Sequence, residues 1–132
     1  MRQPAAKQND IVTATDTHVV IIPGSPPTTA PLPHPFNGIL KDNLSNDVNI
    51  MGLPAATIGS IAQNTPPHIP TSPGASFQTP PSNQGTIKLG SVTVLINGKG
   101  AARNGDIVDT CNDPTDAPVG KVIAAGTVNI GG

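Results

Sequence analysis

The chain repeats one short motif three times, and this repeat constrains the fold more than any other feature. The segment 94–106 (V-L-I-N-G-K-G-A-A-R-N-G-D) aligns with the segment 48–60 (V-N-I-M-G-L-P-A-A-T-I-G-S) at a constant offset of 46 residues. A truncated third copy, 4–10 (P-A-A-K-Q-N-D), opens the chain and aligns with 54–60 at an offset of 50. Such self-similarity is typical of one small unit used repeatedly, since a single copy cannot bury its own apolar face. Three copies predict a pseudo-threefold object.

The last copy indicates what the unit is. Apolar residues alternate along 92–96, which is typical of a strand buried on one face. Asn97-Gly98 follows at once, and this pair favours a type I′ hairpin turn because both positions tolerate positive φ. Each copy is therefore predicted to be a β-hairpin, and 122–130 to be a last strand. We expect the core to contain the side chains of Val48, Val92, Val94 and Ile96, the alternative being an apolar base that meets a partner.

Proline and glycine decide the fold class. The chain has 16 Pro and 14 Gly in 132 residues, which excludes long helices because both residues weaken helix interiors. Charged residues make up 11% and the formal net charge is −1, so charge repulsion gives no reason for disorder. We predict a single all-β domain over 1–132 with little or no helix. Pro-rich segments at 23–36 and 66–81 are expected to run extended along the surface or along sheet edges.

Several classes of partner and location are disfavoured. Residues 1–10 lack the apolar stretch of a signal peptide, so we expect synthesis in the cytoplasm without a leader. The aliphatic run 19–22 is too short to span a bilayer. Only seven Lys and Arg are present and aromatic residues make up 2%, so no nucleic-acid partner is expected.

Three histidines and one cysteine are the candidate metal ligands. They are His18, His34, His68 and Cys111. A single cysteine excludes an internal disulfide. His18 lies eight residues after Asp10 and His68 eight after Ser60, which is the same point of the repeat. Three imidazoles and one thiolate make a closed tetrahedral zinc set, so we predict one structural zinc ion. The alternative is three unrelated loop histidines and a small buried cysteine, since the spacings do not resemble a zinc finger.

The repeated Ala-Ala units resemble a known family motif. The units 5–6, 54–56 and 100–103, each before a turn, look like the proline-alanine-alanine-arginine repeat of PAAR proteins. The resemblance covers nearly the whole chain and is most specific over 96–106 (I-N-G-K-G-A-A-R-N-G-D). No copy spells the full motif, because Lys7 and Thr57 replace Arg and Gly100 replaces Pro.

This resemblance implies a fold and a function. The implied fold is a short conical arrangement of β-hairpins with pseudo-threefold repeats, which caps the trimeric VgrG-type spike of a contractile injection system such as type VI secretion or a phage-tail-like particle. In the family a zinc ion near the apex is held by three His and one Cys, which here implies His18, His34, His68 and Cys111. The protein would pierce target membranes through transient contact and be delivered outside the cell or into the target. We expect no effector extension at either end.

The sequence is also compatible with two other functions. An adaptor would dock an effector onto the spike through the Pro-rich segments. A small zinc hydrolase would use His18, His34 and His68 as ligands and leave a fourth position for water. Its base would be Asp16, Asp106 or Asp109. We expect no enzyme activity, because in a hydrolase the only cysteine would be a spectator.

Overall fold

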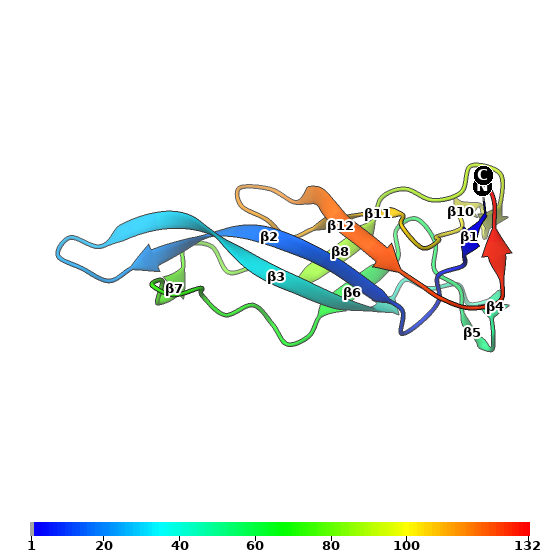
Figure 1. Cartoon of the computed structure of the whole chain (residues 1–132), viewed down its shortest axis with the longest axis horizontal. Coiled ribbons are helices and arrows are strands. Elements are labelled where there is room, and N and C mark those ends of the chain that lie inside the picture. Colours follow the sequence, from blue (N-terminus) through cyan, green and yellow to red (C-terminus); the bar gives the residue numbers. More distant parts are fainter. Residues whose placement is uncertain (1) are drawn as a thin grey trace.

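The computed structural model describes residues 2–132 and is built from strands alone. Residues 2–132 form no helix, and therefore none that could cross a membrane. All paired strands are antiparallel, which confirms the all-β prediction. The strands, labelled in Figure 1, are β1 (Gln3–Pro4), β2 (Ile11–Ile22), β3 (Thr28–Asp42), β4 (Asn49–Ile50), β5 (Leu53–Pro54), β6 (Ile61–Asn64), β7 (Ser76–Phe77), β8 (Gln84–Ile87), β9 (Leu95–Ile96), β10 (Lys99–Gly100), β11 (Ile107–Thr110), β12 (Ala117–Ile123) and β13 (Asn129–Ile130).

Six of these strands close into a ring. The order is β12-β11-β8-β6-β3-β2, and β2 pairs in turn with β12. The ring consists of three antiparallel pairs, β2 with β3, β6 with β8 and β11 with β12, and the first strand of each pair begins directly after a repeat copy. A closed ring leaves no long exposed sheet edge. Its interior is aliphatic, with fully or almost fully buried side chains from Val12, Leu40, Ala62, Ile87, Val108 and Val122.

The three Ala-Ala units meet at one end of the ring in a cycle of backbone hydrogen bonds. Ala6 donates to the carbonyl of Ala102 (2.9 Å), Ala102 to that of Ala56 (3.0 Å), and Ala56 to that of Ala6 (3.0 Å). All three alanines are fully buried. Backbones that approach this closely leave room for little more than a methyl group, because protein interiors are close-packed. The motif therefore has its alanines where three chain segments converge.

The truncated first copy is completed by the other end of the chain. Strand β13 pairs with β1, so that Ile130 lies opposite Gln3. This pair joins the hairpins β4–β5 and β9–β10 as a third short two-stranded unit at the same end, where both termini also lie (Figure 1). We call this region the blunt end. Its core holds Ile50, Ile96 and Ile130 with Ala5, Ala55 and Ala101.

Each repeat copy closes through a side-chain oxygen that accepts the backbone N–H three residues earlier. Such local bonds stabilise turns because they satisfy a donor that no strand partner reaches. The pairs are Lys7 N–H to Asp10 Oδ2 (3.0 Å), Thr57 N–H to Ser60 Oγ (3.0 Å) and Arg103 N–H to Asp106 Oδ2 (2.7 Å).

The predicted strand over 92–96 is shorter than expected. The Ser91 hydroxyl oxygen accepts the N–H groups of Thr93 (3.2 Å) and Val94 (2.9 Å), so the chain turns here and only Leu95–Ile96 is a strand. The turn at Asn97-Gly98 is as predicted, with φ of 52° and 78°.

The burial prediction for these apolar residues is partly wrong. Ile96 is buried, but Val92 is 82% exposed, Val94 37% and Val48 36%. Alternation placed them in the core, but the side-chain-stabilised turn rotates the segment before β9 away from it. The predicted last strand 122–130 is likewise interrupted, because residues 124–128 separate β12 from β13.

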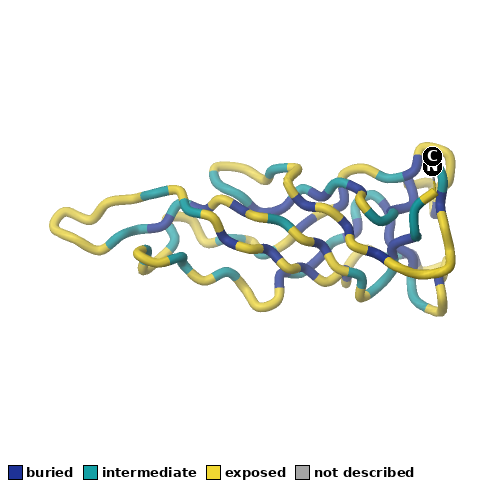
Figure 2. The backbone as a smooth tube through the Cα atoms, in the orientation of Figure 1, coloured by how far each residue is buried: buried dark blue, intermediate teal, exposed yellow. Residues whose placement is uncertain are grey.

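The first Pro-rich segment is mostly strand, and it forms the narrow end of the molecule. β3 pairs with β2 from Thr28 to Ile39, and the two strands run beyond the ring as a single hairpin (Figure 1). Its far tip is exposed (Figure 2). Pro31, Pro33 and Pro35 alternate along the edge of β3 that faces away from β2, and β6 covers this strand only from Gly38 onward. The second Pro-rich segment, 66–81, stays irregular except for β7.

Candidate metal site

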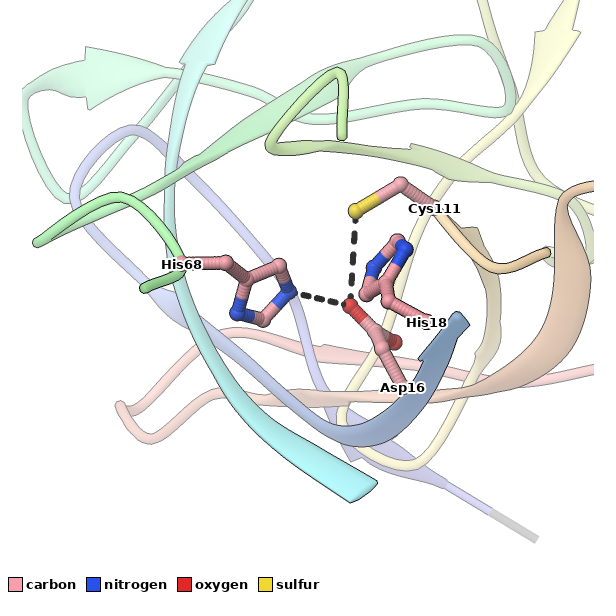
Figure 3. A group of neighbouring side chains, drawn as sticks. All are labelled: Asp16, His18, His68 and Cys111. Atoms are coloured by element: carbon pink, nitrogen blue, oxygen red, sulfur yellow. Dashed lines mark hydrogen bonds and ion pairs between the residues drawn. The ribbon is translucent and has the colours of Figure 1, made fainter. Parts of the chain in front are cut away.

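Four side chains that could hold an ion converge between the ring and the narrow end. Asp16 and His18 lie on β2 two residues apart, and side chains two apart on a strand share a face. His68 follows β6 and Cys111 follows β11. One ligand atom from each of the four lies within 4.8 Å of all the others (Figure 3). We call these four residues the metal cluster.

Asp16 is the hub of this cluster. It is fully buried, and its Oδ2 lies 2.8 Å from His68 Nε2 and 3.4 Å from Cys111 Sγ. Its Oδ1 accepts a short hydrogen bond from the Thr110 hydroxyl (2.5 Å), with Asn112 Nδ2 at 3.4 Å. One oxygen is thus held by neutral donors, and the other faces the remaining ligand atoms.

His18 provides the test of whether an ion fits. The side chain is almost completely buried, and neither ring nitrogen has a hydrogen-bond partner. Among the described residues these are the only buried side-chain nitrogen or oxygen atoms in that condition. A buried polar atom without a partner costs about 1–3 kcal/mol, so such atoms need an explanation. A metal ion would supply a partner for one of the two nitrogens, and Nδ1 lies 3.6 Å from Oδ2 of Asp113.

His34 lies beside the cluster with its own hydrogen bonds. Its ring packs against the rings of His18 (centroids 5.4 Å apart) and His68 (5.6 Å). Its Nδ1 donates to the carbonyl of Leu32 (2.9 Å), and its Nε2 accepts the N–H of Thr71 (3.1 Å). Both ring nitrogens are therefore occupied by backbone groups.

Burial sets the protonation of the cluster without an ion. It raises the pKa of the Cys111 thiol to about 12, and the Asp16 carboxylate adds to this rise. Burial also lowers the pKa of His18, as does repulsion from His68. The pKa of His34 is likewise lowered mainly by burial. A bound cation would stabilise the thiolate and release its proton, so metal binding and protonation are coupled here.

The donor set can bind a metal ion such as zinc. Imidazole nitrogen, thiolate sulfur and carboxylate oxygen are all zinc ligands in proteins. The cluster contains three of the four predicted ligands, His18, His68 and Cys111, with Asp16 as its fourth member. Sequence reasoning considered Asp16 only as a catalytic base. Its position two residues before His18 was the signal that could have identified it, because side chains two apart on a strand share a face.

The other predicted acidic residues lie elsewhere. Asp106 forms an ion pair with Arg103 (2.9 Å) in its repeat turn at the blunt end. Asp109 faces Lys88 on the outside of the ring, with 3.9 Å between the charged atoms. Neither side chain belongs to the metal cluster.

The chain was compared with family models, curated proteins and solved structures. No family model, curated protein or solved structure matches it. What the molecule itself establishes is a small all-β domain with a buried Asp/His/His/Cys group suited to a metal ion.

Proposed function

We propose that this protein is a spike tip: a pseudo-threefold cone that caps the trimeric VgrG-type spike of a contractile injection system and pierces target membranes. The observation that carries the proposal is the blunt end, where two short hairpins and the pair β1–β13 meet around one cycle of alanine hydrogen bonds. A single chain with three similar faces is suited to a partner made of three identical chains. The repeats would reduce the mismatch between one tip and a threefold spike.

The apolar surface of the blunt end supports this partner. Each of the three short two-stranded units carries a valine two residues before its buried isoleucine. Val48, Val94 and Val128 are exposed to nearly the same extent, 36%, 37% and 39%. Apolar residues that gather on one surface are typical of protein interaction sites, whereas single exposed ones are common on any protein. Three equivalent valines would contact three equivalent positions on a trimer.

The metal cluster supports the second half of the proposal. Its residues come from all three strand pairs of the ring: Asp16 and His18 from β2, His68 from the segment after β6, and Cys111 from the segment after β11. One ion would therefore tie the three pairs together near the narrow end. A small domain with few aromatic residues gains much from such a crosslink. We propose a structural zinc ion and no enzyme activity, because four side chains of the chain itself would complete its coordination.

Binding to a trimeric VgrG-type spike protein tests the proposal. Sedimentation of the mixture is expected to give one tip per three spike chains. A variant with Val48→Asp, Val94→Asp and Val128→Asp should lose binding, because three carboxylates would be buried at the interface. Val119→Asp is the matched control, since Val119 is 48% exposed on β12, outside the blunt end. Equal binding by both variants, or none by the parent protein, would contradict this function.

One exposed side chain favours a second candidate, an adaptor that carries an effector. Ile69 is 78% exposed within the Pro-rich segment 66–72, and exposed Pro-rich segments serve as recognition elements in other proteins. Co-purification separates the two functions. An adaptor retains a non-spike protein that Ile69→Ser releases, whereas a bare tip retains the spike alone.

A further inference from the structure

We propose that Asp16 is the fourth ligand of the bound ion, and that His34 is instead the residue that fastens the segment 66–72 to β3. This inference rests on the metal site of the proposed function. It departs from the ligand set that the sequence resemblance implies, in which His34 is a ligand and Asp16 is not.

The Asp16 carboxylate is oriented as a ligand held by its neighbours. The hydroxyl of Thr110 and the amide of Asn112 hold Oδ1, while Oδ2 faces His68 Nε2 and Cys111 Sγ. Metal-binding carboxylates are commonly held in this way, with outer groups hydrogen-bonded to the ligand and fixing its direction. Oδ2 occupies the position from which it would contact an ion shared with the other two residues.

Charge supports the same assignment. Asp16 is fully buried, and among the described residues no lysine or arginine forms an ion pair with it. Its closest charge partner is His68, and a buried carboxylate is costly unless a cation compensates it. A divalent ion bound by Asp16 and the Cys111 thiolate makes a neutral group. Three imidazoles and one thiolate would leave the total charge of this buried group unchanged, but the Asp16 carboxylate would then be compensated through its neighbours and not by direct contact with the ion.

Both ring nitrogens of His34 already have hydrogen-bond partners. To ligate through Nε2 it would have to release the N–H of Thr71, and through Nδ1 the carbonyl of Leu32. His68 Nε2 differs, because its partner is Asp16 Oδ2, and an ion bound to both atoms would replace the hydrogen bond between them. The Thr71 hydroxyl also donates to the carbonyl of Pro33 (2.8 Å), so two bonds join this segment to β3. The same segment carries His68. His34 therefore positions the loop that delivers a ligand, and its ring covers the cluster.

The unaltered protein loaded with zinc gives the primary test. Nitrogen-15 NMR of the histidine rings distinguishes protonated, free and metal-bound nitrogens. Metal-bound shifts are expected for one nitrogen each of His18 and His68. His34 is expected to keep a protonated Nδ1 and an unligated Nε2. X-ray absorption at the zinc edge should require two imidazoles, one sulfur and one further oxygen.

Variants give the second test, with the visible spectrum of bound Co²⁺ as the readout of the ligand set. Asp16→Asn is expected to weaken zinc binding by about 100-fold or more and to change the Co²⁺ spectrum, since even outer groups contribute 10- to 100-fold. His34→Gln should leave the spectrum unchanged and weaken zinc binding by about tenfold, the lower end of the range for outer groups, while increasing hydrogen exchange at Thr71. Asp109→Asn is the matched control and should alter neither.

The outcomes separate this inference from the proposed function. If zinc binds but His34 shows a metal-bound nitrogen, or if His34→Gln alone changes the Co²⁺ spectrum, the assignment of Asp16 is wrong and the structural ion stands. If the unaltered protein binds no zinc, both are wrong. Loss of spike binding by the valine variant is independent of either result.

Discussion

The blunt end and the metal cluster hold together in different ways. At the blunt end, three alanines exchange backbone hydrogen bonds and three isoleucines pack beneath the short hairpins. Among the described residues, no buried side-chain nitrogen or oxygen at that end lacks a hydrogen-bond partner. At the cluster, a carboxylate, a thiol and imidazoles are buried together, and His18 has no hydrogen-bond partner.

This difference indicates which end depends on a ligand. Buried polar groups stabilise a fold only when all are satisfied, and a partly satisfied set is costly. The blunt end should therefore be stable by itself, whereas the cluster should need its ion. The two ends should therefore differ in how far their stability changes on metal removal, on mutation and with pH.

Removal of the metal should have the largest effect. A chelator is expected to lower the melting temperature by about 15 °C, because structural zinc contributes many kcal/mol and 1 kcal/mol corresponds to roughly 4 °C for a chain of this size. Hydrogen exchange measured in parallel should be local. The amides of Thr17 and Val19, bonded to Asn112 and Asp113, should lose protection, while Ala56 keeps its own. Uniform loss across both ends would remove the distinction.

Overpacking the alanine cycle should come next and should not depend on zinc. Ala102→Val adds two methyl groups where Ala102 is fully buried, and overpacking typically costs about 1–3 kcal/mol. The melting temperature should fall by roughly 4–10 °C with and without chelator. Ala125→Val, at an exposed position, is the control and should change it little. An effect present only in the zinc-loaded protein would show that the two ends are coupled.

Loss of one repeat turn should have a smaller effect. Ser60 is fully buried, accepts the N–H of Thr57 (3.0 Å) and donates to the carbonyl of Asn43 (2.7 Å). Ser60→Ala leaves both groups without this partner, and since a hydrogen bond typically contributes about 1 kcal/mol net, urea unfolding should show a cost of roughly that size. Ser82→Ala, at an exposed position, should cost far less. Equal costs for the two would mean that the repeat turn adds nothing to stability.

The smallest effect should be the pH dependence of the metal-free protein. Burial lowers the pKa of His18 and of His34 below the ordinary 6.5. The unfolded chain therefore takes up protons below about pH 6.5 that the folded chain does not, so stability falls as the pH drops. Urea midpoints in chelator should be lower at about pH 5.5 than at about pH 7.5. The slope should flatten in His18→Leu, and a higher midpoint at the lower pH would contradict the prediction.

The sequence was more informative about the blunt end than about the metal cluster. Repeats reveal equivalent turns directly, and all three Ala-Ala units lie together as one set. Pairing between β13 and β1 was not predicted, because two-residue strands at opposite ends of a chain carry no periodic signal. The exposure of Val92 was missed for a related reason, since the Ser91 turn outweighed the alternation that follows it.

The metal cluster could be predicted only in part. Rarity selected His18, His34, His68 and Cys111, because so few side chains in this chain bind metals, and three of these four belong to the cluster. Rarity could not rank Asp16 above the other seven aspartates, since most of them belong to turns or to the surface. That choice depends on which carboxylate becomes buried, and burial is a property of the folded chain.

The prolines of β3 affect whether the protein aggregates at high concentration. Pro31, Pro33 and Pro35 lie on the edge of the projecting hairpin that faces away from β2, so the three residues have no N–H to donate there, and the carbonyl of Pro33 already accepts the Thr71 hydroxyl. A second chain could not extend the sheet there by regular strand addition, which is the usual route from an exposed edge to aggregation. The protein can therefore expose a long, narrow ribbon at high concentration without that ribbon seeding fibrils.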